Sequence, residues 1–192
     1  QGRSLGNPLP RWPDAYMLED FLDGRCEDAA TSGLSFRRGV LLKALPVPAD
    51  IFCWYDEFLI AHCLFYADMG NIPRVLGYHR IHGANNWAHR LGHPDLMEGY
   101  VRQGRLFFGS LEPRLKETGR ELTPRFRRAI DIDFQRSEIL AATSRGHRGK
   151  AFSAWRHLAA AHGGTGVGAF RSALLLLAVV HPSLYMGLYK LY

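Results

Sequence analysis

Apolar residues recur every three to four positions along most of the second half of the chain. This spacing places them on one face of a helix. The predicted helices cover residues 95–118, 124–144 and 150–162. Gly146 and Gly149 interrupt the pattern between the last two, which indicates a helical hairpin. The second half is therefore expected to be helical up to the Gly-Gly-Thr-Gly joint at 163–166.

The first half alternates shorter helical and extended patterns. Helical spacing covers residues 14–22, 37–45 and 56–69. Residues 30–36 are expected to be a loop that enters a short strand, and residues 72–81 are expected to be a strand. The order of strand, two helices and strand implies a mixed sheet layered by helices. The expected fold class is α/β, or α+β if the chain is a fragment, with an α-helical C-terminal region.

The last segment, 169–192, is strongly apolar. Its longest apolar run is 173–180, whereas a membrane-spanning helix needs about twenty residues. Tyrosines and few charges follow that run. The segment is therefore expected to be an interfacial anchor or a docked amphipathic element rather than a transmembrane helix.

Charge separates the two halves of the 192-residue chain. The net charge is +6, with −1 over residues 1–92 and +7 over 93–192. Basic helices raise the possibility of nucleic-acid binding, but no nucleic-acid motif is present and aromatic residues are not interleaved as stacking platforms. Arginine next to an apolar tail suits anionic lipid headgroups better. A solvated helical face is the remaining alternative.

Cysteine and histidine give weaker signals. The three cysteines, an odd and sparse set, argue against a disulfide framework and favour a reducing cytoplasm. Four histidines, His79, His82, His89 and His93, lie within fifteen residues of one another. A zinc site would want closer, paired ligands, so zinc is a minor alternative.

The segment from Ala30 to Trp87 carries the candidate chemistry. Its small-residue loop, Thr31, Ser32 and Gly33, allows close approach of the backbone to a ligand and offers hydroxyls to a sugar. Arg37 and Arg38 can bind phosphate through two hydrogen bonds each. Asp56 begins a helix after the aromatic pair Trp54-Tyr55 and could act as a general base.

Each of these features also has a purely structural interpretation. Asp56 alone is commonly a helix N-cap, and the Thr-Ser-Gly loop alone is commonly an ordinary turn. His82, which follows the predicted strand 72–81, could bind a divalent metal or a diphosphate, yet a single histidine is more often structural. The order and spacing of the parts decide between the two interpretations.

The order T-S-G-L-S-F-R-R, then Asp56 about twenty residues later, then G-Y-H-R-I-H-G-x-N-N resembles the C-terminal half of a family 2 glycosyltransferase. The resemblance covers roughly residues 1–90. It implies a GT-A fold, in which a nucleotide-sugar-binding half precedes an acceptor-binding half. It also implies inverting transfer of a sugar from a nucleotide-diphosphate sugar to a glycan or lipid-linked acceptor. A divalent metal, Mg or Mn, would neutralise the leaving group.

The resemblance assigns roles by position. Asp56 matches the catalytic base, and His82 matches the histidine near the metal and diphosphate. The remaining expected substrate-binding residues are Thr31, Ser32, Gly33, Arg37, Arg38, Trp54, Glu57 and Arg80.

Two family features are missing, the apolar first strand and the Asp-x-Asp metal motif. The only Asp-x-Asp is Asp131-Ile132-Asp133, which lies in an Arg-rich helical context and is expected to be a solvated helix face, paired with neighbours such as Arg127. Tyr55 stands where many members have Glu. Because the chain also begins with Gln rather than Met, we expect a C-terminal fragment that has no activity alone.

Three regions follow from these patterns: an acceptor-side half of a GT-A domain at 1–92, a helical region at 93–162 and a membrane-interfacial tail at 163–192. The function expected from the resemblance is sugar transfer in cell-surface polysaccharide or glycolipid synthesis, in the cytoplasm at the inner face of the plasma membrane and without nucleic acid as a partner. The alternative is a non-catalytic helical module that binds a membrane surface or a protein.

Overall fold

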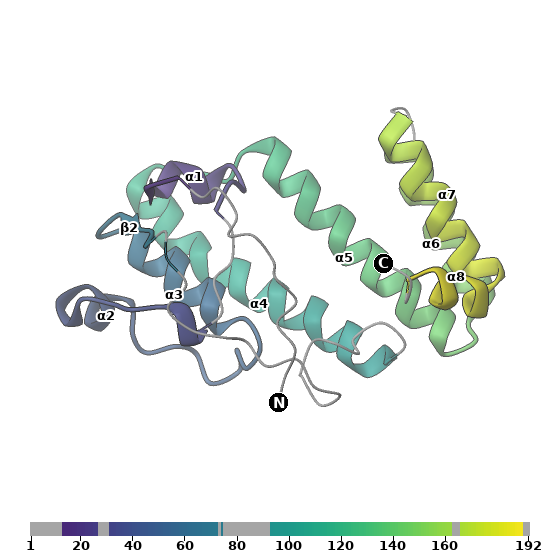
Figure 1. Ribbon diagram of the computed structural model, residues 1–192, viewed down its shortest axis with the longest axis horizontal. Helices are drawn as coiled ribbons and strands as arrows, with labels where there is room; N and C mark the ends of the chain where they lie inside the picture. The colour runs from purple at the N-terminus through teal and green to yellow at the C-terminus, as the bar shows by residue number, and fades with distance from the viewer. Residues whose placement is uncertain (1–12, 27–30, 73, 75–92, 163–165, 190–192) are drawn as a thin grey trace.

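The computed structural model describes residues 13–26, 31–72, 74, 93–162 and 166–189, and it is mostly helical (Figure 1). The elements are β1 (Ala15–Tyr16), α1 (Leu18–Leu22), the 3₁₀ turn η1 (Thr31–Gly33), α2 (Arg38–Ala44), α3 (Tyr55–Leu64), β2 (Met69–Gly70), α4 (Pro94–Thr118), α5 (Pro124–Ser144), α6 (Arg148–His162), α7 (Gly166–Val180) and α8 (Pro182–Tyr189). In Figure 1, α1, α2 and α3 gather at one end and α6, α7 and α8 at the other. The long helices α4 and α5 run between these ends.

Helices α4 and α5 form a hairpin whose turn follows local rules. Gly119 ends α4 with φ 63°, and its N–H bonds the carbonyl of Leu115. A left-handed residue at this position is usually glycine, because a Cβ there is strained. Thr123 caps α5 by accepting a hydrogen bond from the N–H of Phe126 at 3.2 Å, and Pro124 follows as the first helical residue.

The first core, which we call the aromatic core, lies where α1 and α3 pack on α4 and α5. Its largest buried members are aromatic, namely Phe21, Trp54, Phe58, Phe107 and Phe134. Burial of such side chains contributes about 1.5–3 kcal/mol each. This core therefore attaches the short N-terminal elements to the α4–α5 hairpin.

The second core, the alanine-rich core, joins the far end of α5 to α6 and α7. Small side chains are frequent in it, including Ala141, Ala142, Ala151 and Ala178. Small residues let helices approach closely, and the α5–α6 contact confirms the predicted hairpin of 124–144 with 150–162. The segment predicted as an apolar tail forms α7 and α8. Across the described ranges, none of the helices combines the length and the apolarity needed to cross a membrane.

The structure confirms the predicted helices over 37–45, 95–118, 124–144 and 150–162 to within two residues at each end. It corrects two predictions in the first half. The predicted helix over 14–22 begins as a strand, because Tyr16 is buried and pairs with Met69. The predicted helix over 56–69 ends at Leu64 because Met69 takes part in that pairing.

The predicted strand within 30–36 is wrong: residues 31–33 form a 3₁₀ turn and 34–37 are unpaired. The predicted strand 72–81 lies almost wholly outside the described residues. Within the described part of the chain, the sheet is a single antiparallel pair, with Ala15 opposite Gly70 and Tyr16 opposite Met69. The expected mixed sheet is therefore not observed there, although a helical chain with a small sheet fits the broader α+β class.

Candidate functional site

A buried amide fixes the loop that leads into α3. Gln103 of α4 is only 1% exposed. Its Nε2 donates to the carbonyl of Asp50 at 2.5 Å, and its Oε1 accepts from the N–H of Phe52 at 2.6 Å. A buried polar group left without partners costs about 1–3 kcal/mol, so these paired bonds hold the loop in register with α4. The start of α3 is thereby positioned on the α4–α5 hairpin.

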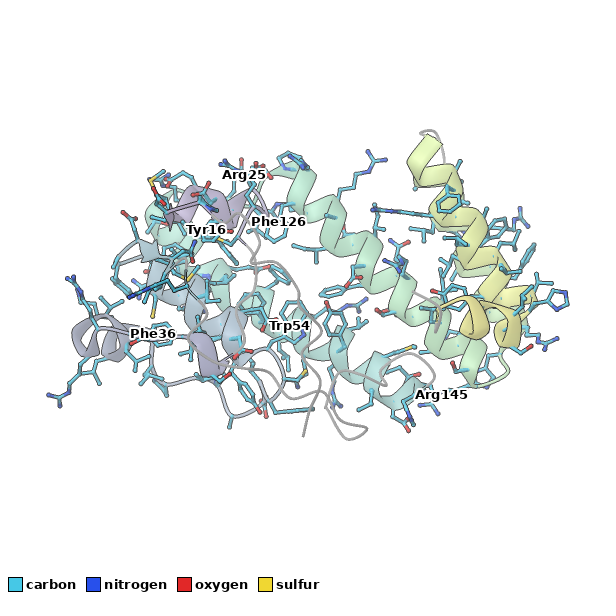
Figure 2. All side chains as sticks on the ribbon, viewed as in Figure 1. Tyr16, Arg25, Phe36, Trp54, Phe126 and Arg145 are labelled. Carbon is cyan, nitrogen blue, oxygen red and sulfur yellow. The ribbon has the colours of Figure 1, made fainter. Side chains whose placement is uncertain are left out.

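Trp54, the residue before α3, lies at the centre of the aromatic core (Figure 2). Its indole N–H donates to the carbonyl of Tyr100 at 3.2 Å, and its ring stacks on Phe107 with centroids 5.4 Å apart. The side chain is 8% exposed. Trp54 was expected to bind substrate; it is a packed core residue that forms part of the wall of an adjacent cavity.

Asp56 and Glu57 occupy the first turn of α3. Trp54 is the N-cap of this helix, so the interpretation of Asp56 as the cap is wrong. Carboxylates in a first turn are stabilised by the positive end of the helix dipole. Both side chains are partly exposed. This places two carboxylates at the surface directly beside the buried Trp54.

A cavity of about 220 Å³ opens between α3, α4 and α5. Its polar lining includes Glu57, Tyr100 and Asp133. Aromatic side chains make most of the remaining wall, namely Phe21, Trp54, Phe107, Phe108, Phe126 and Phe134. Figure 2 shows two of them, Trp54 and Phe126, on the side of α5 that faces α3 and α1. The cavity therefore combines apolar walls with a few placed polar groups, which is typical of small-molecule sites.

The Asp-x-Asp segment lies on a partly exposed face of α5: Asp131 is exposed, as the sequence predicted, and the Asp133 side chain is 40% exposed at the edge of the cavity. The hydroxyl of Tyr100 donates to Oδ2 of Asp133 at 2.9 Å, and a guanidinium nitrogen of Arg136 lies 3.9 Å from Oδ1. Helical spacing in the sequence indicates that Asp133 lies beside the cavity. Phe126, Ile130 and Asp133 follow i, i+4, i+7 and so share the apolar face of α5. Arg127, the expected partner, donates instead to the carbonyl of Leu122.

The other predicted residues are not gathered at this cavity. The 3₁₀ turn at 31–33 and the exposed Arg37 and Arg38 belong to the segment before α3. Arg80 and His82 lie outside the described residues. In the part of the chain that the structure describes, no group of three or more His, Cys, Asp or Glu side chains could hold a metal ion. The described residues therefore do not form the expected metal site by themselves.

Histidine and cysteine on α3 have shifted pKa values. The ring of His62 stacks on Phe58 with centroids 4.0 Å apart, and its Nε2 lies 3.3 Å from the hydroxyl of Ser110. Burial, and secondarily the charge of Arg114, lower the pKa of His62 to about 4. Burial raises the pKa of the Cys63 thiol, so this thiol is a poor nucleophile. All three cysteines are free, as the sequence predicted.

Comparison with known proteins gives one short similarity. A protein of Nostoc sp. (strain PCC 7120) that carries the name uncharacterized glycosyltransferase is 42% identical over 57 residues, which make up 29% of this chain and 18% of that protein. The matched region thus spans less than a fifth of the curated relative. No family model and no solved structure matches the chain. The similarity supports a relationship to glycosyltransferases in general and shows neither a particular family nor a fold.

Proposed function

We propose that this chain is part of an enzyme that transfers a sugar from a nucleotide-diphosphate sugar to a hydroxyl of a glycan or lipid-linked acceptor, with inversion, as in family 2 glycosyltransferases of the GT-A type. The short match to a protein named a glycosyltransferase supports the general class. The finer assignment rests on the T-S-G-L-S-F-R-R segment and on Asp56. Synthesis of cell-surface polysaccharide or glycolipid is the proposed setting.

The observation that carries the proposal is the position of Asp56. Its carboxylate lies in the first turn of α3, partly exposed, and the next residue lines the cavity. In the proposed step this carboxylate takes the proton of the acceptor hydroxyl while that oxygen bonds to the anomeric carbon. The bond from the anomeric carbon to the diphosphate oxygen breaks, and the nucleoside diphosphate leaves with the electron pair. General-base catalysis of this kind contributes about 10²–10⁴-fold.

The donor side of the proposal follows the resemblance of the sequence to family 2 glycosyltransferases. Thr31, Ser32 and Gly33 are proposed to face the sugar, and Arg37, Arg38 and Arg80 to bind phosphate. A divalent metal with His82 as a ligand remains a prediction from the resemblance. The sequence-based prediction that the 192-residue chain alone transfers no sugar also stands. Detectable transfer by that chain would contradict it.

The test is a transfer assay on protein expressed from its complete reading frame. A panel of nucleotide-diphosphate sugars is offered with Mg²⁺ or Mn²⁺, and release of nucleoside diphosphate is measured. Asp56→Asn is expected to lower kcat about 10²–10⁴-fold with little change in KM. Asp68→Asn is the matched control, because Asp68 is exposed just beyond the other end of α3. An equal loss in both variants, or none in either, would reject Asp56 as the base.

We also propose that α6, α7 and α8 dock on an anionic membrane surface. Residues 139–192 contain six Lys and Arg and no Asp or Glu. On α7 and α8, Phe170 is 65% exposed, Val180 is 49% exposed and Leu184 is 53% exposed. Exposed apolar side chains together with an excess of basic residues are typical of helices that lie in a membrane interface.

Vesicle co-sedimentation tests the docking proposal. Binding to vesicles with anionic lipid is expected to exceed binding to zwitterionic vesicles and to fall with added salt. The double variant Phe170→Ser, Leu184→Ser is expected to lose most binding. Leu42→Ser, which changes an equally exposed leucine on α2, is the matched control. Failure to sediment even with anionic vesicles would leave the alternative of a helical module that binds a protein.

A further inference from the structure

We propose that the cavity between α3, α4 and α5 binds one uncharged sugar ring of the acceptor. The aromatic walls would hold the ring, and Glu57 and Asp133 would accept hydrogen bonds from its hydroxyls. This inference rests on the proposed function and deepens it, because it adds residues of the helical region, such as Phe126 and Asp133, to the acceptor subsite. The resemblance covers Trp54 and Glu57 but stops near residue 90 and does not reach these helical residues.

The size of the cavity limits its occupant. Its volume of about 220 Å³ is below the range of roughly 300–1,000 Å³ that holds a drug-sized ligand. A nucleotide-diphosphate sugar, with a base, a ribose, two phosphates and a hexose, is larger than such a ligand. A single six-membered ring with its hydroxyls is the scale of group that the cavity can take.

The lining has the two kinds of surface that a sugar ring presents. Phe108 and Phe126, which are only partly buried, offer apolar surface for the C–H side of the ring. A carboxylate has about four acceptor positions, and the hydroxyl of Tyr100 occupies one of those on Asp133. The remaining positions of Asp133 suit the hydroxyl donors of a sugar, and the carboxylate of Glu57 lines the cavity nearby. Hydrogen bonds to charged groups are stronger than those between neutral groups.

The charge of the cavity lining favours an uncharged sugar over the nucleotide-diphosphate donor. Among the lining residues that the structure describes, the ionisable acids are Glu57 and Asp133, and no lysine or arginine lines the wall. Two carboxylates repel a diphosphate or a uronic acid, whereas an uncharged ring brings no such cost. Arg136, 3.9 Å from Asp133, offsets part of that charge without lining the cavity. The electrostatics thus favour the acceptor over the donor.

The position of the cavity also fits an acceptor subsite. Glu57 lines it, and Asp56, the proposed base, precedes Glu57 in the same helical turn. Asp56 itself is not among the residues that line the cavity, so the reacting hydroxyl would have to extend from the bound ring past Glu57 toward Asp56. Holding the reacting hydroxyl near its base is the kind of positioning that lowers the entropic part of a barrier.

Direct binding to the 192-residue chain tests the inference without requiring catalysis. Saturation-transfer difference NMR is recorded with methyl glycosides of uncharged hexoses, with methyl glucuronide and with uridine diphosphate. We expect transfer to at least one uncharged glycoside and none to the two anionic probes. Asp133→Asn and Glu57→Gln are each expected to weaken that binding about 5–100-fold.

A plugging variant supplies the structural control. Ala129 lines the cavity from an exposed position on α5, so Ala129→Phe is expected to fill the cavity without disturbing the buried wall. Ser144→Phe adds the same ring to an exposed position near the end of α5 and is expected to leave binding unchanged. Thermal melts of both variants check folding. Glycoside binding that survives Ala129→Phe, or that is absent from the unaltered chain, would overturn the inference.

Two results separate this inference from the proposed function. If Asp56→Asn abolishes transfer in the complete protein while Ala129→Phe leaves the acceptor KM unchanged, the subsite is wrong and the function stands. If glycosides bind the cavity but no donor supports transfer, the sugar site stands and the function is wrong. If both hold, Ala129→Phe is expected to raise the acceptor KM at least about tenfold, with little change in the donor KM.

Discussion

The aromatic core and the alanine-rich core both pack helices against one another, but with side chains of different size. Bulky rings in the aromatic core hold α3 away from α5 and leave a cavity with polar groups at its edge. In the alanine-rich core, small side chains bring α5, α6 and α7 together, and larger apolar groups such as Phe170 face outward. In this molecule the core with large side chains therefore lies beside a cavity, whereas the core with small side chains lies beside exposed apolar groups.

The helices α4 and α5 belong to both cores, yet the two ends of the molecule differ in charge. The aromatic core carries acidic groups around its cavity, and residues 139–192 carry none. A single hairpin therefore links an acidic cavity to a basic surface. Four predictions test how far the two ends act separately.

The largest effects are expected from truncation within each core. Phe107→Ala in the aromatic core should cost about 3–5 kcal/mol of unfolding free energy, and Ile139→Ala in the alanine-rich core about 2–5 kcal/mol, because both side chains are fully buried. Amide hydrogen exchange is the measurement. Phe107→Ala should increase exchange mainly in α1 and α3, and Ile139→Ala mainly in α6 and α7. Equal increases everywhere would mean that the two cores unfold as one unit.

The next effect concerns the close contact of α4 with the aromatic core. A Cβ on Gly104 would lie 2.5 Å from Cζ of Phe134 and 2.9 Å from the ring of Trp54. Gly104→Ala should therefore destabilise the protein by about 1–3 kcal/mol, despite the better helix propensity of alanine. Denaturant unfolding measures the change. Gly99→Ala, on the same helix with open space around it, is the control and should stabilise by up to about 1 kcal/mol.

A smaller effect should appear at the aromatic-core end, as a dependence of stability on pH that comes from His62. The pKa of His62 is about 4 in the folded protein, below its ordinary value of 6.5. The unfolded chain therefore binds the proton more tightly, so stability falls as the pH drops from about 6.5 to 4. Because the ring is only partly buried, we expect a loss of about 1–2 kcal/mol. Urea unfolding against pH should show this loss in the parent and not in His62→Gln.

The smallest effect is expected at the cap of α5. Thr123→Ala removes the acceptor for the N–H of Phe126 and should cost about 1 kcal/mol. Thr118→Ala, at the end of α4, removes only a hydroxyl that donates to helix carbonyls and should change stability less. Exchange should rise in the first turn of α5, next to the aromatic core. A rise near the alanine-rich core instead would show that cap loss spreads along the whole helix.

Helices with long, regular apolar spacing could be predicted from the sequence, and short elements could not. The range 124–144 agrees with α5 because Thr123, Pro124 and the apolar repeat all give the same limits. Residues 14–22 failed because Tyr16 pairs with a partner more than fifty residues away, which local spacing does not encode. Two-residue strands depend on such tertiary pairing rather than on propensity.

The candidate site could be predicted only in part, because local patterns indicate some of its residues and tertiary contacts bring in the others. Asp56 and Glu57 follow from a local pattern at a helix start. Tyr100 and Asp133 meet across two helices, so their contact requires the crossing of α4 and α5. The Asp-x-Asp pattern predicted a solvated face, and Asp133 combines a partly exposed side chain with a place at the edge of the cavity. Gln103 carries no motif, and only its burial shows that it holds the loop before α3.

The unbroken helix α5 sets the distance between the cavity and the alanine-rich core. Ile130 lines the cavity and Ala142 belongs to the alanine-rich core, so a rise of 1.5 Å per residue separates them by about 18 Å along one unbroken helix. If α7 and α8 rest on a bilayer, α5 acts as a spacer that holds the cavity at a set offset from the docked helices. Acceptors would then be selected by length, and the sugar that reaches Asp56 would have to stand clear of the lipid surface.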